Sequence, residues 1–319
     1  MARTNPVLQR RTLLAGLLLA SAAPARADAV KIRLGTATPG GGFPVYGAAF
    51  VDAVRSVDPG LEIEQINTKG STENVPMLED NRLDIALVQG EVVHEALSGI
   101  GRQPADLKVI TAMYATAGMF VVRADVPYRS INDLKGRPIA WGAAGSGLVI
   151  LGRYVMDGIG LDAARDFQPI YLERAGDGPA MVLDGRAAAL WGGGAGWPGF
   201  MTMAKSEKGA RFIAPGADEI ARILARHPFL KRVTQPAGSF SGQDEDIASV
   251  GSWSFVMARP GLNEAIAFRL AKALHDVEKA GHAPRQLLET TLGNTVSVAP
   301  TGRLHPGVAR YLREAGLGK

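Results

Sequence analysis

Two glycine-rich turns, each between a predicted strand and a predicted helix, are the segments of this sequence best suited to hold a small ligand. The first is Gly40–Gly42 and the second is Gly142–Gly147. Backbone N–H groups at a strand-to-helix turn lack intrahelical partners, so they suit an anionic or polar ligand. The first turn is not a nucleotide motif, because Ala48 and Ala49 stand where a phosphate-binding loop needs lysine and serine or threonine. A purely structural turn is the alternative, since glycine also serves wherever φ must be positive.

Ser146, inside the second turn, has two compatible interpretations. It is either the N-cap of the following helix or a hydroxyl donor to the ligand. A nucleophilic role is excluded by the neighbours, because Ala144 and Leu148 occupy the two positions where a nucleophile elbow requires glycine.

A third polar segment, Asn67–Asn74, joins a predicted strand to a predicted helix. Ser71 and Asn74 fit an N-cap and the first helical turn. Together with Lys69 and Thr72, the same two side chains also form a polar cradle suited to a carboxylate. Both interpretations stay open.

Catalytic and metal-binding patterns are missing from the sequence. The five histidines are scattered and lack a metal-ligand spacing. No nucleophile–base pair can be assembled, so we expect no catalytic residue, no metal and no cofactor. Trp191 and Trp197 flank the glycine-rich stretch 192–196, and core packing and ligand stacking are equally compatible with them.

The first 27 residues read as an export signal. Arginines at positions 3, 10 and 11 precede the apolar run Leu13–Ala20, and Ala25–Ala27 is a small-x-small cleavage site. We expect cleavage after Ala27 and export by the general secretory or the twin-arginine route. The apolar run is too short for a membrane anchor.

Removal of this signal changes the charge of the chain. The full sequence has 35 Lys and Arg against 31 Asp and Glu, and the signal carries four arginines and no acid, so the mature chain has zero net charge. A neutral chain lacks the electrostatic footprint of nucleic-acid binding. The sequence has no cysteine, which excludes disulfides, thiolate nucleophiles and zinc–sulfur sites. We therefore expect a soluble, monomeric, periplasmic protein.

Alternating strand-like and helix-like segments predict an α/β fold with largely parallel sheets. The pattern strand, glycine turn, helix, strand occurs twice, which predicts two similar lobes: residues 28–118 with 250–319, and residues 119–249. Two crossing strands, Met119–Arg123 and Ser249–Met257, are the expected hinge, and the ligand is expected in the cleft between the lobes. A strand at Leu107–Met113 precedes the first crossing strand. Three helices are expected near the end of the chain: Asn263–Lys279, Ala283–Leu292 and Pro306–Ala315.

The motifs together resemble the TAXI family, the solute-binding proteins of tripartite ATP-independent periplasmic (TRAP) transporters. The matching segments, which cover nearly the whole mature chain, are Gly35-Thr36 with Gly40–Phe43, Thr68–Asn74 (T-K-G-S-T-E-N), Asp84–Gln89 (D-I-A-L-V-Q), Gly142–Gly147 and His305–Gly316. The second and the last of these are the more specific.

This resemblance implies a type II periplasmic-binding-protein fold, with two Rossmann-like lobes that close on a small carboxylate and present it to a TRAP permease. Glutamate, glutamine, 2-oxo acids and dicarboxylates are the expected ligands. Phe43-Pro44 replaces the usual tyrosines, which removes hydroxyl donors, and Lys69 replaces a common glycine, which adds a cation. The ligand-binding residues, by motif and by the polar segments above, are Gly41, Gly42, Phe43, Lys69, Ser71, Thr72, Asn74, Gln89, Gly145, Ser146, Gly147, Trp191 and Trp197.

Two other functions remain compatible with the same sequence. One is an exported receptor that passes the ligand signal to a membrane sensor protein. The other is an exported hydrolase or transferase on a similar α/β frame, which would need a nucleophile–base pair that the sequence does not display.

Overall fold

The computed structural model describes residues 1, 29–194 and 196–317. The predicted export signal, residues 1–27, lies outside the described residues except for Met1.

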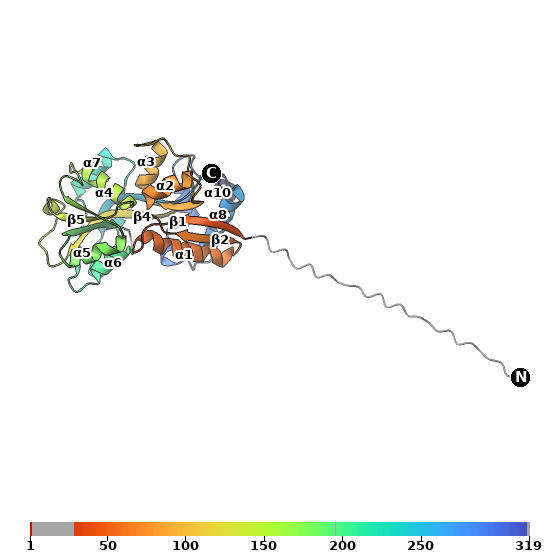
Figure 1. The fold of residues 1–319 in the computed structure, drawn as a ribbon, viewed down its shortest axis with the longest axis horizontal. Helices are drawn as coiled ribbons and strands as arrows, with labels where there is room; N and C mark the ends of the chain where they lie inside the picture. The colour runs from red at the N-terminus through yellow and green to blue at the C-terminus, as the bar shows by residue number, and fades with distance from the viewer. Residues whose placement is uncertain (2–28, 195, 318–319) are drawn as a thin grey trace.

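Two sheets that share one long strand, β4, form the frame of the molecule (Figure 1). In the first sheet the order is β2-β1-β3-β10-β4, and in the second it is β6-β5-β7-β4-β8, with β9 added to β10. The strands are β1 (Val30–Gly35), β2 (Leu61–Ile66), β3 (Ile85–Val88), β4 (Lys108–Arg123), β5 (Pro138–Ala143), β6 (Gln168–Leu172), β7 (Ala189–Gly193), β8 (Ala210–Ile213), β9 (Lys231–Gln235) and β10 (Ile247–Ala258).

The two sheets have the same topology. In each, three parallel strands are followed by one antiparallel strand that arrives from the other half of the molecule: β10 in the first sheet and β4 in the second. We call the halves built on these sheets the first and the second lobe. The predicted two-lobed α/β fold is confirmed.

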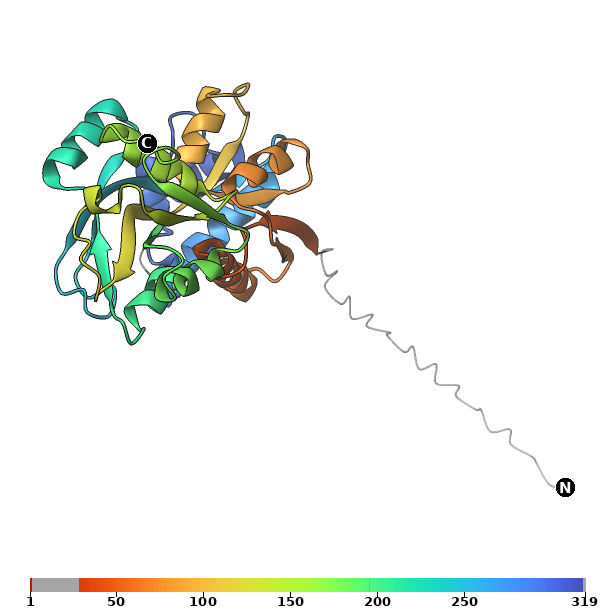
Figure 2. The same cartoon turned by 60° about the vertical axis from the view of Figure 1, so that its left-hand side comes forward.

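Helices cover both faces of each sheet (Figures 1 and 2). In the first lobe, α1 (Gly42–Val57), α8 (Glu264–Lys279) and α10 (Pro306–Glu314) share one apolar core, and α2 (Ser71–Glu79) and α3 (Gly90–Ser98) cover the opposite face. In the second lobe, α4 (Gly147–Gly158) and α7 (Ala217–Arg226) lie on one face and α5 (Gly178–Leu183) and α6 (Pro198–Ala204) on the other. Alternate residues of β3 face the two cores of the first lobe, as expected for a strand buried on both sides.

The first crossing strand is longer than predicted. One continuous strand, β4, replaces the separate strands expected at Leu107–Met113 and Met119–Arg123. The intervening segment is rich in small residues, and its backbone comes close to its neighbours: a Cβ on Gly251 of β10 would lie 1.7 Å from the Thr116 carbonyl oxygen. Small residues at this crossing permit that close approach. They also interrupt the apolar pattern in the sequence, so the pattern does not predict one continuous strand here.

The helix predicted at Ala283–Leu292 is wrong. The structure has a single 3-10 turn at Arg285–Leu287 and then α9 (Leu292–Val298). The physical reason is Thr291, whose hydroxyl accepts a hydrogen bond from Asn294 N at 3.0 Å and so caps a new helix.

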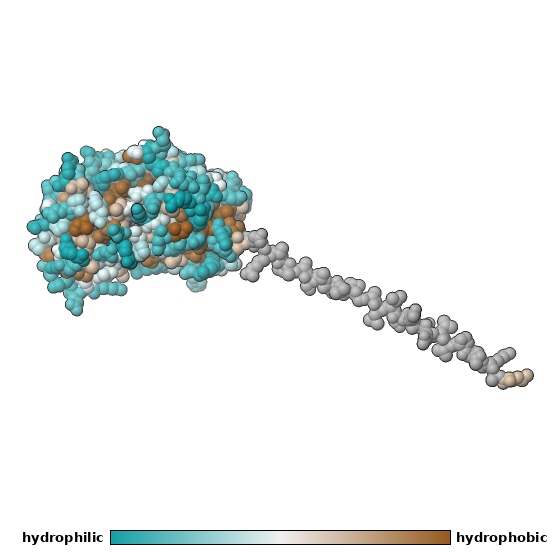
Figure 3. All heavy atoms as spheres, viewed as in Figure 1, coloured by the Kyte–Doolittle hydropathy of each residue, from teal (hydrophilic) through white to brown (hydrophobic). Residues whose placement is uncertain are grey.

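Hydrophilic side chains cover most of the face seen in Figure 3, and the hydrophobic patches on it are small. Within the described ranges, no helix has the length and apolar character needed to cross a membrane.

Candidate ligand-binding site

A cavity that is partly open to solvent lies between the two lobes. The first lobe contributes the turn before α1, the start of α2 and the crossing strand β4. The second lobe contributes the turn before α4, together with Ala175, Gly193 and Trp197. The polar side chains that line it are Thr38, Lys69, Ser71, Gln89, Tyr114, Thr116 and Ser146.

Three helices begin at this cavity. Gly42, Ser71 and Gly147 are the first residues of α1, α2 and α4, and all three line it. The first N–H groups of a helix have no intrahelical partner, and the helix dipole places partial positive charge there. The arrangement therefore favours an anion.

Ser146 caps α4, with its hydroxyl accepting a hydrogen bond from Leu148 N at 3.2 Å. Its predicted role as an N-cap is confirmed. Ser146 also lines the cavity, so the two interpretations of this residue coexist.

The charge of the cavity lining is positive. Among the described lining residues Lys69 is the only charged side chain, it is exposed at the rim, and no acidic side chain lines the cavity. Tyr114 and Thr116 add hydroxyl groups from β4. Burial, with a smaller contribution from the Glu289 charge, raises the pKa of Tyr114, so its phenol remains a protonated donor.

Gln89 forms part of the cavity floor between the lobes. It is the N-cap residue of α3, and its backbone N donates to the Ser71 hydroxyl at 3.0 Å. Gly147 of the second lobe lies against it, since a Cβ there would be only 2.5 Å from the Gln89 Cβ. Glycine at this position therefore permits α4 to begin directly over Gln89.

The aromatic side of the cavity is formed by Trp197. Its indole lies against Gly42 of the first lobe, and a Cβ on Gly192 or Gly199 would approach the ring to 2.4 or 2.5 Å. The glycines around this tryptophan thus make room for it.

Nine of the thirteen predicted ligand-binding residues line the cavity: Gly41, Gly42, Phe43, Lys69, Ser71, Gln89, Ser146, Gly147 and Trp197. The other four, Thr72, Asn74, Gly145 and Trp191, lie elsewhere.

Thr72 and Gly145 join the two lobes at the cavity edge. The Thr72 backbone N and its hydroxyl both donate to the Gly145 carbonyl oxygen, at 3.2 and 3.1 Å. A second contact joins the lobes at the first glycine turn, where Ala175 N donates to the Thr38 hydroxyl at 3.2 Å. The structure therefore has its lobes in direct contact on two sides of the cavity.

Asn74 is a structural side chain and does not belong to the polar cradle. It is fully buried, and its Nδ2 donates to the carbonyl oxygens of Thr36 and Leu87, both at 2.8 Å. These bonds tie together the ends of β1 and β3. The prediction that Asn74 belongs to a carboxylate-binding cradle is wrong, because its side chain turns back toward the sheet.

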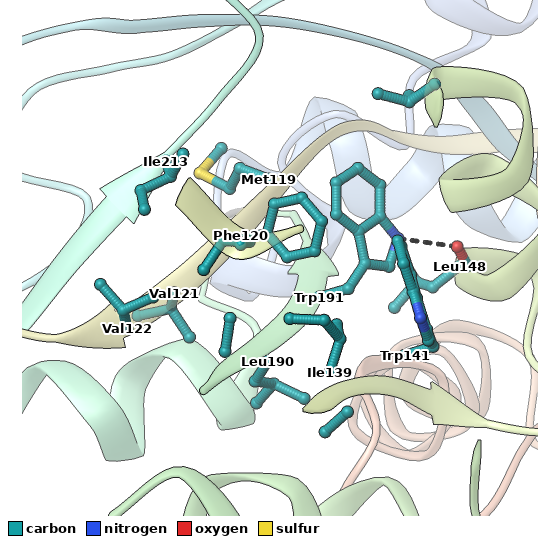
Figure 4. Close-up of a cluster of buried hydrophobic side chains, with 14 of the residues drawn as sticks. Met119, Phe120, Val121, Val122, Ile139, Trp141, Leu148, Leu190, Trp191 and Ile213 are labelled. Atoms are coloured by element: carbon teal, nitrogen blue, oxygen red, sulfur yellow. Dashed lines mark hydrogen bonds between the residues drawn. The ribbon is translucent and has the colours of Figure 1, made fainter. Parts of the chain in front are cut away.

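Trp191 lies in the core of the second lobe and not in the cavity. Figure 4 shows it beside Phe120 and Trp141, with its indole N–H donating to the Leu148 carbonyl oxygen at 2.8 Å. It is fully buried. Of the two interpretations of Trp191, the structure supports core packing.

Sequence reasoning missed several lining residues, among them Thr38, Tyr114, Thr116 and Ala175. Tyr114 and Thr116 fall in the gap between the two strands predicted for the crossing. An aromatic and a hydroxyl residue in a short unassigned gap between two strand patterns was the signal that could have found them.

The comparisons with known proteins agree with this architecture. Residues 34–316 match the NMT1-like family. A structure described as a periplasmic transporter has 15% identity and a TM-score of 0.53, with 80% of this chain and 84% of that chain covered. A mutant of full-length BenM has 13% identity and a TM-score of 0.50, with coverage of 82% and 70%.

The periplasmic aliphatic sulphonate binding protein SsuA from Escherichia coli has 18% identity and a TM-score of 0.47, with coverage of 89% and 82%. At these identities the likeness concerns the fold, which is the predicted type II periplasmic-binding-protein fold. Because the family match spans most of the chain, the protein belongs to the NMT1-like family.

Proposed function

We propose that this protein is an exported solute-binding protein that captures a small carboxylate in the cavity between its lobes. One observation carries the proposal: three helices begin at a cavity whose described lining holds one lysine and no acid. Each helix N-terminus stabilises a negative charge by about 0.3–1 kcal/mol, and by up to about 2 kcal/mol when partly buried. A neutral ligand would gain little from this arrangement.

Binding works by closure of the lobes. The first lobe contributes the α1 and α2 N-termini and the second lobe the α4 N-terminus, so a carboxylate held by all three interacts with both lobes. Such a ligand stabilises the closed state over an open one. We propose that the lobes are residues 28–118 with 250–319 and residues 119–249, so that the divide passes through β4 and β10.

The finer assignment rests on the motif resemblance. We propose that the protein is a periplasmic, monomeric TAXI-type receptor that delivers its ligand to a TRAP permease, and that it performs no catalysis. Glutamate, glutamine, 2-oxo acids and dicarboxylates are the candidate ligands. Delivery of the signal to a membrane sensor is the alternative, and co-purification of the membrane partner distinguishes the two.

A binding screen tests the proposal. Purified protein is assayed by thermal shift and calorimetry against amino acids, 2-oxo acids and dicarboxylates, each paired with its carboxamide or methyl ester. We expect carboxylates to raise the melting temperature and the uncharged partners to have no effect, with the ligand recovered unchanged by NMR. Equal shifts for acids and esters would refute anion recognition, and consumption of the ligand would favour an enzyme.

A further inference from the structure

A buried carboxyl group lies behind the cavity floor. Glu91, the second residue of α3, is 0% exposed. One carboxyl oxygen, Oε1, accepts a hydrogen bond from the Ser252 hydroxyl of β10 at 2.7 Å. The other, Oε2, has no hydrogen-bond partner in the part of the chain that the structure describes.

Gln89 stands between this carboxyl group and the cavity. Its side chain lines the cavity and its amide faces the Glu91 carboxyl. The Nε2 atom of Gln89 is buried and, within the described residues, also has no hydrogen-bond partner. An unsatisfied buried polar group costs about 1–3 kcal/mol. Two such atoms on facing side chains mark a pair that gains free energy by rearranging.

We propose that Glu91 is a positioning residue that determines which end of the Gln89 amide faces the ligand, so that the cavity takes up a carboxylate together with one proton. This inference rests on the proposed function, because it concerns how the same cavity binds a carboxylate.

Two hydrogen-bond arrangements follow from the two protonation states. Ionised Glu91 only accepts, so it takes the Nε2–H of Gln89 and leaves the Gln89 Oε1 facing the cavity. That oxygen repels a carboxylate. Protonated Glu91 donates its O–H to Gln89 Oε1, which turns the Gln89 NH₂ toward the cavity as a donor to the carboxylate. The proton comes from solvent, and no covalent bond changes.

The charges around Glu91 leave its protonation state open to change near neutral pH. On α3 itself, His94 and Glu95 are nearest in sequence, and Glu95 is paired with Arg153 and with the Tyr154 hydroxyl of α4. From β10 the facing group is the neutral Ser252 hydroxyl.

On α2, Glu73 accepts from Lys69 N at 2.6 Å and Glu79 pairs with Arg102 at 2.5 Å, so both acids of that helix are engaged elsewhere. Burial raises the pKa of Glu91 to about 7, although the hydrogen bond from Ser252 opposes the shift. Both forms are therefore populated at neutral pH.

The direction of the pH dependence follows from this scheme. Because the carboxylate prefers protonated Glu91, affinity is full below about pH 7 and falls as the pH rises above it. One linked proton gives about a tenfold loss of affinity for each further pH unit. A carboxylate without an amine stays ionised throughout this range, so the ligand itself contributes no titration.

Calorimetry on the unmodified protein tests the proposal. The tightest-binding amine-free carboxylate is titrated between about pH 5.5 and about pH 8.5, in buffers of different ionisation enthalpy. We expect close to one proton taken up per ligand at the upper end of the range and none at the lower end. Carboxylate binding without proton uptake overturns the proposed role of Glu91 but does not contradict the proposed function. No carboxylate binding at any pH overturns both.

Variants separate positioning from structure. Glu91→Gln can donate its own N–H to Gln89 Oε1, so it is expected to bind with the low-pH affinity at every pH. Gln89→Leu keeps Glu91 but removes the amide, and is expected to bind weakly with no pH dependence. The matched controls, Glu95→Gln and His94→Gln, keep the pH profile of the unmodified protein. Retention of the profile in Glu91→Gln or Gln89→Leu, or its loss in both controls, overturns the proposal.

Discussion

We predict that closure of the lobes depends on the glycine at position 145. A Cβ at this position would lie 2.7 Å from both the Cβ and the carbonyl oxygen of Lys69 in the other lobe, closer than real Cβ contacts allow. The Lys69 backbone cannot give way as the tip of a flexible side chain can. Gly145→Ala is therefore expected to hold the lobes apart at this edge. The φ of Gly145 is not positive, so alanine strains nothing within its own loop.

The magnitude follows from the contacts that are lost. Separation breaks the two hydrogen bonds from Thr72 to the Gly145 carbonyl oxygen, at 3.2 and 3.1 Å. Each contributes about 0.5–1 kcal/mol net. Loss of about 1–2 kcal/mol from the closed state weakens ligand binding by about 5- to 30-fold.

Two measurements check this prediction. Calorimetry with the tightest-binding carboxylate gives the affinity, and small-angle X-ray scattering gives the compactness with saturating ligand. Gly293→Ala is the matched control, because its Cβ would meet only the Thr291 hydroxyl oxygen at 3.9 Å. If Gly145→Ala binds and compacts like the control, the lobe contact at this glycine does not limit closure.

Three further predictions concern charge, core and pH. Lys69→Met should weaken carboxylate binding by about two- to fivefold at low salt and by less at high salt, because exposed charge pairs contribute about 0.2–1 kcal/mol. The control Lys135→Met should leave the affinity unchanged. An equal loss of affinity for uncharged ligands would contradict this prediction. Trp191→Phe should lower the free energy of unfolding by about 1–3 kcal/mol, measured by urea denaturation, with affinity unchanged. Lowered affinity with an unchanged free energy of unfolding would instead indicate that Trp191 contacts the ligand. Burial would raise the pKa of Asp84, but hydrogen bonds led by those from Arg33 lower it overall. Its contribution to stability is therefore present above about pH 4 and lost as the pH falls through the lowered pKa, and Asp84→Asn should flatten that part of the stability–pH curve.

Much of the fold was predictable because the local pattern and the global architecture agree. The glycine turn before α4 and the helix at 264–279 carry their own signals: Ser146 and Asn263 are N-caps, and both cap their helices in the structure. The same holds for the two-lobed arrangement, which follows from the repeated order of strand, turn and helix.

Several elements were not predicted. No element was assigned to α3, α6, α7, β8 or β9. The helix α6 has only seven residues, and β8 and β9 are short strands that pair with the crossing strands. Their existence depends on partners far away in the chain, which a local pattern does not contain.

The site was predicted in outline and missed in detail for the same reason. Glycines and short polar side chains indicate strand-to-helix turns, so Gly42, Ser71 and Gly147 were found as site residues. Asn74 shares the polar character of its neighbours, and only the three-dimensional structure shows that its amide turns inward to Thr36 and Leu87. A residue type specifies which hydrogen bonds are available, whereas the backbone position decides which are made.

The sharing of β4 between the two sheets has a consequence for how the molecule loses its structure. Residues 108–117 of β4 pair within the first sheet and residues 118–123 within the second. Melting either sheet removes β4 from the other, so neither half is an independent cooperative unit. The protein is thus expected to denature in one all-or-none transition, with equal calorimetric and van't Hoff enthalpies. The strand that joins the two lobes therefore also couples their unfolding.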